Sequence, residues 1–318
     1  MDLQDRLHIV LRDARSARYK VTDLVYDSGS GEFTGTVLLD GDGINYMGPP
    51  ENKRNSTGTR YNNVSNKLHS TAATSFDLSA AALHIIAMTL MLMDHLWATL
   101  LPAQEWLTCA GRLAFPIFAF MAVEGYFHTR SFKKYALRML LFAVLSEMPF
   151  DLMYGGTWFY PVHQNVIWTL LLGLLGIHLM ENARKKQKIW LTLLVSVLAV
   201  AAGGLLGTLC MVDYYGAGVL TVFLFYFFRG RKWWCLLGQA VALYWVNVEL
   251  LGGLMYPVQL LGMDLELCQQ GLALLALIPI WLYRGRQGYH SKPFQYACYG
   301  FYPVHMLVLV LALNFVNR

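Results

Sequence analysis

The chain has 318 residues, of which 56% are hydrophobic and only 14% are charged, and its formal net charge is +5. This composition excludes an ordinary soluble domain, in which about a quarter of the residues are charged. The basic residues fall in short clusters between apolar segments, which indicates membrane topology and not a nucleic-acid-binding face. The five cysteines form no CxxC pair, so no disulfide framework and no metal site are predicted.

Residues 1–76 form a small polar module that differs from everything after it. Its first 19 residues predict a short amphipathic helix, and KVTDLVYDSGSGEFTGTVLLDGDG (20–43) predicts two alternating strands around a Ser-Gly turn. The stretch 48–75 is rich in Asn, Ser and Thr, which is typical of a linker. We expect a cytoplasmic α+β element here that packs against a partner protein or a second copy of the chain, because an isolated hairpin is only marginally stable.

Residues 77–318 carry repeated apolar segments of membrane-spanning length. They predict an all-α polytopic membrane protein, a bundle of about nine transmembrane helices, with 8–10 as the range. The segment 252–263 is too short to cross a bilayer and is predicted to be re-entrant or interfacial. The nine spans are expected at 79–101, 110–128, 135–154, 164–181, 188–211, 215–228, 233–250, 267–283 and 294–316.

Basic residues set the expected orientation, because Lys and Arg near helix ends stay on the cytoplasmic side. The loops around Arg130, Lys185, Arg231 and Arg286 are basic, and they alternate with loops that carry essentially no Lys or Arg. The N-terminus is therefore predicted to be cytoplasmic.

Ionisable side chains inside the spans are costly in lipid, so they should face the bundle interior or a water-filled cavity. Given the orientation, one group forms an extracytoplasmic layer: Asp94, His95, Arg112, Glu147, Asp151, His163, Gln164 and Asn165. Helical spacing adds two polar stripes, His84 to His95 on the first span and Gln295 to His305 on the last. Tyr302 lies on the second stripe, and Pro303 is expected to open the backbone beside His305.

A titratable imidazole beside a carboxylate in the membrane is the arrangement that a general base needs, which favours a catalytic role for Asp94 and His95. A purely structural Asp94–Arg112 ion pair is the alternative. A second group lies at the cytoplasmic end: Glu124, His128, Arg130, Lys133, Lys134 and Arg138. It is either the ordinary positive-inside signature or a seat for an anionic group such as the phosphates of a nucleotide.

Three segments, MDHLW (93–97), GRLAFPIFAFMAVEGYFHTRSFKKYALRMLLFAVLSEMPFDLMY (111–154) and HQNVIWTLLLGLLGI (163–177), resemble the TraX family. The resemblance covers the chain from about residue 79 to the C-terminus. The founding member is associated with N-terminal acetylation of the pilin of a conjugative plasmid, which implies a membrane acetyltransferase. A wider resemblance is to multi-span acyltransferases that take an acyl group from cytoplasmic acyl-CoA.

The resemblance implies a site with two ends. At the outer end His95 is the base, Asp94 orients it, and Arg112 or Asn165 stabilises the oxyanion. His305, with Tyr302, is the second candidate base, and Glu147 recognises an acceptor amine. At the inner end the phosphates of acetyl-CoA, the donor substrate, bind to His128, Arg130, Lys133, Lys134 and Arg138. The residues expected to bind substrate are Asp151, His163, Gln164, Asn165, Glu124 and Tyr302.

Two other functions stay open at this point. Intramembrane Asp, Glu and His residues also mark proton-coupled transporters, although no inverted repeat is evident in the sequence. The N-terminal module favours an assembly or scaffold protein. The acceptor of an acyl group is equally open: a pilin or secreted peptide, a cell-surface sugar and a lipid all suit an extracytoplasmic or membrane-embedded site.

Overall fold

The computed structural model describes residues 19–27, 32–39, 42–46, 77–260, 263–289 and 291–316. The chain divides into two compact units, residues 1–75 and 76–318, and each is described by itself.

The N-terminal unit contains a three-stranded antiparallel sheet in the order β1 (Tyr19–Asp27), β2 (Glu32–Leu39) and β3 (Asp42–Tyr46). Tyr19 pairs with Leu39 at one end of the β1–β2 hairpin. The two predicted strands are thus confirmed, whereas the third was missed because its five residues carry little alternation. Most of the predicted amphipathic helix and the linker 48–75 lie outside the described residues.

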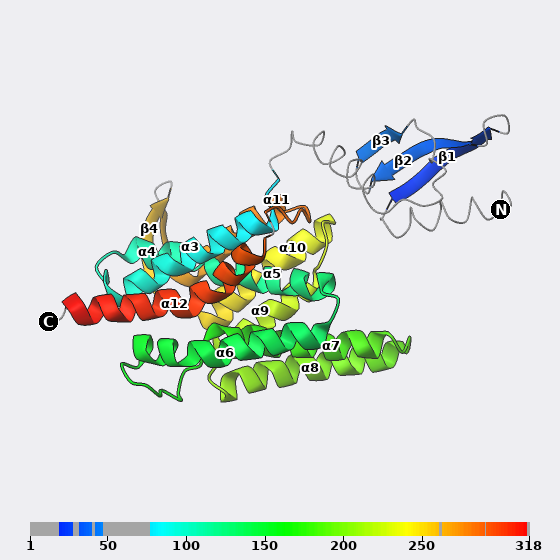
Figure 1. Cartoon of the computed structure of the whole chain (residues 1–318). Coiled ribbons are helices and arrows are strands. Elements are labelled where there is room, and N and C mark those ends of the chain that lie inside the picture. Colours follow the sequence, from blue (N-terminus) through cyan, green and yellow to red (C-terminus); the bar gives the residue numbers. More distant parts are fainter. Residues whose placement is uncertain are drawn as a thin grey trace. The chain divides into compact units, whose positions relative to one another are not determined.

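The membrane unit is built mainly of helices joined by short loops (Figure 1). A π-helical turn, η1 (Trp245–Leu251), continues helix α10 (Trp233–Tyr244). A 3₁₀ segment, η2 (Gln269–Ala276), precedes helix α11 (Leu277–Leu282). Its elements are α3 (Ala80–Thr99), α4 (Glu105–Gly111), α5 (Ala114–His128), α6 (Phe132–Tyr154), α7 (Val166–Arg184), α8 (Ile189–Leu209), α9 (Tyr215–Phe227), α10 (Trp233–Tyr244), η1 (Trp245–Leu251), β4 (Met255–Leu260), β5 (Met263–Cys268), η2 (Gln269–Ala276), α11 (Leu277–Leu282) and α12 (Lys292–Val316).

Six helices in the described part of the chain are long and apolar enough to cross a membrane. They are Ala80–Thr99, Glu105–His128, Val166–Arg184, Ile189–Leu209, Trp233–Leu251 and Pro293–Val316. The expected count of about nine transmembrane helices is therefore not supported.

Each of the three unsupported spans has a physical reason. Helix α9 has 13 residues, and the segment Gln269–Leu282 is also shorter than a bilayer requires. Helix α6 has 23 residues, but it is too charged, with Lys133, Lys134, Arg138, Glu147 and Asp151. An apolar run in a sequence does not reveal whether lipid or protein will cover it. Residues 252–263 lead into the β4–β5 hairpin, which sequence analysis did not foresee.

Helix α9 is the centre of the bundle. It contacts α5, α7, α8, α10 and η1, and most of its side chains are buried, including Val219, Val222, Phe223 and Phe225. Because protein covers it, α9 does not need the length of a bilayer. Together with Leu83, Ile117, Leu174 and Leu243 it forms an apolar core between the two ends of the bundle.

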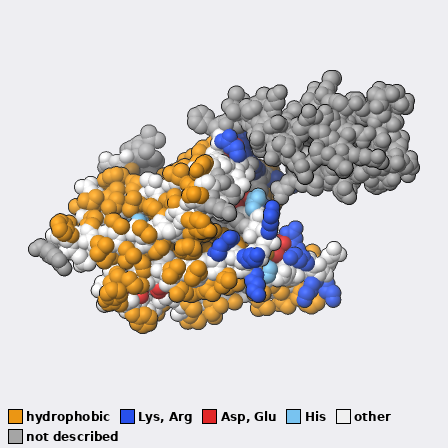
Figure 2. Space-filling view, in the orientation of Figure 1, with side chains coloured by type: hydrophobic (Ala, Val, Ile, Leu, Met, Phe, Trp, Pro, Cys, Tyr) orange, Lys and Arg blue, Asp and Glu red, His pale blue; other side chains and the backbone are white. Residues whose placement is uncertain are grey.

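Helix termini alternate between these two ends. The loops after α5, α7, α9 and α11 carry the basic clusters, and the visible face of the unit is largely hydrophobic away from them (Figure 2). The loops 100–104, 155–165, 210–214 and 252–268 at the opposite end contain no Lys or Arg. This is the alternation that the sequence predicted. We call the two ends the basic end and the cavity end.

The α8–α9 contact depends on glycines, and it positions the turn that enters the cavity end. A Cβ at Gly207 would lie 2.9 Å from the Tyr215 carbonyl oxygen and 3.0 Å from the Gly216 Cα, whereas a Cβ at Gly204 would meet nothing within 4 Å. We expect Gly207→Ala to destabilise the protein by about 1–3 kcal/mol through overpacking. Gly204→Ala, one turn away on α8, should be neutral or slightly stabilising. Thermal unfolding in detergent measures both, and equal losses would contradict this packing.

Candidate active site

The cavity end encloses a cavity of about 440 Å³. Side chains from α3, α5, α12 and η2 line it, together with the loop before α7 and the turn before α9. Ionisable and phenolic groups on its wall are Asp94, His95, Arg112, Tyr154, His163, Asp213, Tyr214, Tyr215 and Tyr302. The structure thus brings five of the predicted site residues, Asp94, His95, Arg112, His163 and Tyr302, to one cavity.

Asp94 and Arg112 form an ion pair on one wall. Arg112 Nη2 donates to Asp94 Oδ1 at 2.5 Å, and Thr108 Oγ1 donates to the same oxygen at 2.7 Å. Arg112 Nη1 also donates to Gln270 Oε1 at 3.3 Å. Gly111 allows this approach, because a Cβ there would overlap the Asp94 side chain. Asp94 therefore binds Arg112, as in the structural interpretation, and does not orient His95.

His95 is buried and is held by a second histidine. Its Nδ1 lies 2.7 Å from His305 Nε2, and the two rings are nearly parallel, although the residues are 210 positions apart in sequence. His305 Nδ1 lies 2.6 Å from the Phe301 carbonyl oxygen, which only accepts hydrogen bonds, so this nitrogen carries the proton. In neutral His305, Nε2 then accepts, and His95 Nδ1 donates to it. The lone pair of neutral His95 is thereby left on Nε2, where a general base needs it.

Pro303 lies inside an unbroken α12, so the expected opening of the backbone beside His305 is not observed. The His305 ring instead packs against Phe301, with ring centroids 4.6 Å apart. The two predicted bases therefore form one pair and are not independent alternatives.

His163 lies on another wall, in the loop before α7. Its Nε2 lies 3.3 Å from Asp213 Oδ1. This hydrogen bond, opposed by partial burial, raises the pKa of His163 above 6.5. Because a carboxylate only accepts, Nε2 donates in both protonation states, and Nδ1 is the nitrogen that gains or loses the proton.

The turn that supplies Asp213 has an unusual backbone. Of the four non-glycine residues with left-handed φ in the described part of the chain, three are Met211, Tyr214 and Tyr215, at 52°, 59° and 50°. Such conformations are costly and persist only where the surrounding structure enforces them. Here the Gln164 N–H donates to the Met211 carbonyl at 2.9 Å, and the Asp213 N–H donates to the Gln164 carbonyl at 2.9 Å. These bonds fix the His163 loop to the Asp213 turn.

Four predicted residues of the outer layer do not line the cavity, because hydrogen bonds within the bundle use their side chains. Asn165 caps α7 by accepting from the Ile167 N–H, and its Nδ2 donates to Glu147 Oε2 and the Ala143 carbonyl. Asp151 accepts from the Tyr160 N–H. Gln164 Nε2 donates to the Pro161 carbonyl. The expected roles of Asn165 at the oxyanion and of Glu147 at the acceptor amine stay predictions.

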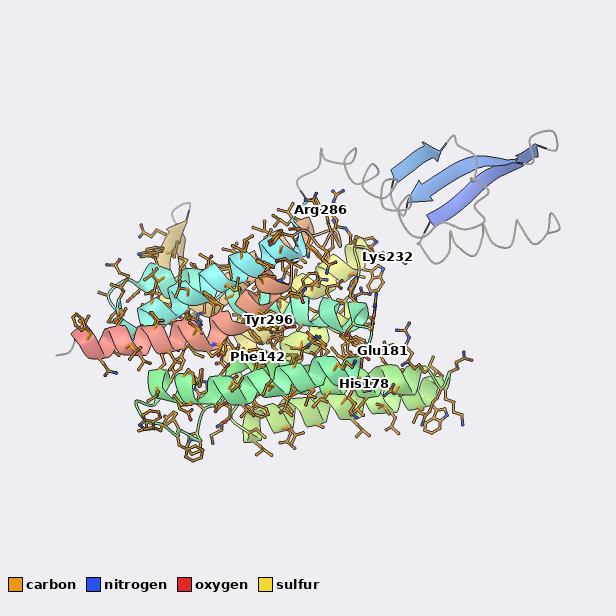
Figure 3. All side chains as sticks on the ribbon, in the orientation of Figure 1. Phe142, His178, Glu181, Lys232, Arg286 and Tyr296 are labelled. Carbon is orange, nitrogen blue, oxygen red and sulfur yellow. The ribbon has the colours of Figure 1, made fainter. Side chains whose placement is uncertain are left out.

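The other predicted cluster lies at the basic end. His128, Arg130, Lys133, Lys134 and Arg138 are exposed there. Glu124 instead accepts two hydrogen bonds from Arg229, at 2.6 and 3.2 Å, and is therefore paired. His178 and Glu181 of α7 lie toward this same end (Figure 3). The span Glu105–His128 separates the cluster from Arg112 by about 24 Å at 1.5 Å per residue.

Sequence analysis missed several cavity residues. Asp213 follows an apolar span directly, so it was counted as part of a loop, and Gln270 and Thr108 carry no charge to attract notice. The pattern D-Y-Y at 213–215, with one acid and two aromatics between two apolar helices, was the available signal. No group of three or more His, Cys, Asp or Glu residues suited to a metal ion occurs in the part of the chain described by the structure.

The fold and the cavity define a multi-pass membrane protein whose ionisable side chains gather inside the helix bundle. A family model described as "TraX protein" matches residues 79–313, and the chain belongs to the TraX family. It is 29% identical over 255 residues to the probable fimbrial assembly protein FimC, serogroup H1, of Dichelobacter nodosus. That alignment covers 76% of this chain and 98% of that protein. No solved structure matches the chain.

The Asp94–Arg112 pair generates a stability prediction. Arg112→Gln leaves the Asp94 carboxylate, whose side chain is only 15% exposed, without its cation, so we expect a loss of about 3 kcal/mol. The double variant Asp94→Asn/Arg112→Gln should recover much of that loss, because no charge is then stranded. Thermal unfolding of the single and double variants in detergent measures the coupling. Strictly additive losses would mean that the two side chains do not interact.

His163 generates a pH prediction. Its folded-state pKa is raised above 6.5, so its imidazolium stabilises the fold fully below that value, and this contribution is lost as the pH rises through the raised pKa. The difference in Tm between the wild type and His163→Gln should therefore shrink between about pH 6 and pH 9. Asp213→Asn should shrink the same difference, since the carboxylate causes the shift. A difference in Tm that grows with pH would contradict the assignment.

Proposed function

We propose that this protein is a membrane-bound acyltransferase that moves an acetyl group from acetyl-CoA to an amine or hydroxyl of an acceptor at the membrane. The acceptor classes are a peptide or pilin N-terminus and a cell-surface glycan. The observation that carries the proposal is the His95–His305 pair, whose free Nε2 belongs to a residue on the wall of a cavity that also contains the Arg112 cation. Membership of the TraX family, which is associated with pilin acetylation, supports it.

The cavity residues match the needs of acyl transfer. As the acceptor nitrogen or oxygen attacks the acyl carbonyl carbon, His95 Nε2 takes its proton. The carbonyl oxygen becomes an oxyanion, and the positive charge of Arg112 stabilises it. The carbon–sulfur bond then breaks, and coenzyme A leaves as the thiolate. Asp94 and Gln270 hold the guanidinium in place through their hydrogen bonds.

The donor, acetyl-CoA, also needs a binding site for its phosphates. We propose that its phosphates bind the exposed His128 together with the exposed cations Arg130, Lys133, Lys134 and Arg138, since clustered cations recognise phosphate. The apolar core lies between this cluster and the cavity, so the thioester must travel the length of the α5 span. The proposal further assigns the basic end and the N-terminus to the cytoplasm of a bacterial cell, by the positive-inside rule.

A role in assembly is the second candidate, because the relative from Dichelobacter nodosus is named as a probable fimbrial assembly protein and aligns over 98% of its length. Such a role needs a stable protein partner and no proton acceptor in the cavity. It therefore predicts that a change at His95 leaves the partner complex and its output intact.

Transfer activity separates the two functions. We expect His95→Gln to lower transfer of labelled acetyl from acetyl-CoA to peptide amines about 100-fold or more, the usual contribution of a general base. His84→Gln is the matched control, because His84 lies on the same helix but bonds the Ala80 carbonyl outside the cavity. The assay uses the full-length protein in liposomes, with thermal unfolding as a check on folding. Equal activity of the His95 and His84 variants would sink the assignment.

A further inference from the structure

The cavity contains a second acid–base group that the transfer step above does not use. His163 and Asp213 lie on its wall, with side chains that are each 27% exposed. The hydrogen bonds between residues 164 and 211–213 hold this dyad, and Thr169 Oγ1 donates to the Asp213 carbonyl at 2.7 Å. The cost of three left-handed residues in the same turn indicates that its position matters.

An amine acceptor that binds as an ammonium must lose two protons, and a single base accepts one. An α-amino group has a pKa of about 7.7–8.0, so most of it is ammonium at neutral pH and has no lone pair for attack. It must lose one proton to become a nucleophile and a second as the amide forms. A hydroxyl acceptor has to lose only one. His95 Nε2 accepts one proton per turnover, so an amine that enters the cavity as ammonium needs a second acceptor for its first proton.

We propose that His163 and Asp213 form the subsite for the acceptor amine, in which Asp213 attracts the ammonium and His163 Nδ1 removes its first proton. This inference rests on the proposed acyl transfer. The nitrogen–hydrogen bond breaks toward His163, and the electron pair stays on the amine. The neutral amine attacks the acyl carbon, His95 Nε2 takes the second proton, and coenzyme A leaves as thiolate. Both imidazoliums then return their protons to water.

The surroundings of His163 suit this transfer. Asp213 is its direct partner, Glu147 of α6 is the other carboxylate that acts on it, and Tyr154 and Tyr215 pack near its ring. Glu147 is already bonded to Asn165 and Trp168, so Asp213 is the carboxylate that faces the cavity. Together these carboxylates raise the pKa of His163, against the opposing effect of partial burial, and so make it a stronger proton acceptor.

The aromatic lining adds attraction for a cation. Tyr154, Tyr214 and Tyr215 all line the cavity beside the dyad. Aromatic ring faces attract ammonium groups within about 6 Å of the ring centroid. Asp94, the other carboxylate of the cavity, already has its charge compensated by Arg112. The ammonium is therefore expected at Asp213 and not at Asp94.

A pair of acceptors tests the inference. One is a short peptide with a free N-terminal amine, and the other is the same peptide with an aminooxy nitrogen, which is neutral at pH 7. We expect His163→Gln to lower acetyl transfer to the amine peptide about tenfold at pH 7, because about a tenth of the α-amine is neutral at that pH, and to leave transfer to the aminooxy peptide within about twofold. The loss on the amine peptide should shrink as the pH rises through the α-amine pKa of about 7.7–8.0 and disappear once the amine is neutral.

Three further variants serve as comparisons for His163→Gln. Asp213→Asn should reproduce the His163→Gln pattern and raise KM for the amine peptide. His95→Gln should lose both reactions, because both acceptors still give up one proton. Thr157→Ala, in the same loop but bonded to the Phe159 carbonyl, should change neither. Equal loss on both acceptors in His163→Gln, or no loss on either, would overturn the subsite.

A binding measurement keeps this test independent of catalysis. Full-length protein should bind the amine peptide about tenfold more weakly after Asp213→Asn, while its binding of the aminooxy peptide stays unchanged. If the wild type transfers acetyl to neither peptide but this difference in binding persists, acyl transfer fails and the ammonium subsite stands. If transfer occurs but the difference in binding is absent, the subsite fails and acyl transfer stands.

Discussion

The pairing of Asp94 with Arg112 is the interaction on which the site depends. A lone charge inside a helix bundle in lipid costs several kcal/mol, so neither residue would be tolerated at this depth by itself. Thr108 and Gln270 complete the hydrogen bonding, and Gly111 leaves the space for the carboxylate. These contacts tie α3, the α4–α5 span and η2 together at one end. The cavity therefore has a polar wall without a stranded charge.

The central helix α9 imposes the second constraint. It is short, apolar and covered by neighbouring helices, so apolar side chains fill the middle of the bundle. Polar chemistry is consequently confined to the two ends. One end presents exposed cations, and the other encloses histidines, carboxylates and tyrosines. Any reaction that uses a phosphate-bearing donor at the basic end must overcome this separation, which makes donor passage the central mechanical question for the proposed acyl transfer.

Particular residues show where sequence reasoning succeeded and where it failed. The spacing of apolar runs and the basic loops predicted the helical fold and the two ends, because lipid imposes length and charge rules that are local in sequence. It overcounted the spans at α6, α9 and the segment 267–283, since apolar runs look alike whether lipid or protein covers them. It placed Glu147 and Asn165 beside the chemistry, although they bond each other and the ends of α6 and α7.

The sequence by itself determined the membrane setting, the helical class and the family, because apolar runs of spanning length and family motifs are local features of a sequence. It also placed Asp94, His95, Arg112 and His163 near the same ends of their helices. Tertiary structure decided the partners. His95 contacts His305, which lies 210 positions away in the sequence, and Asp94 forms its ion pair with Arg112. His163 hydrogen-bonds Asp213, which lies in a turn that contains three left-handed residues. Helical spacing specifies the face from which a side chain projects, but only packing specifies what that face meets.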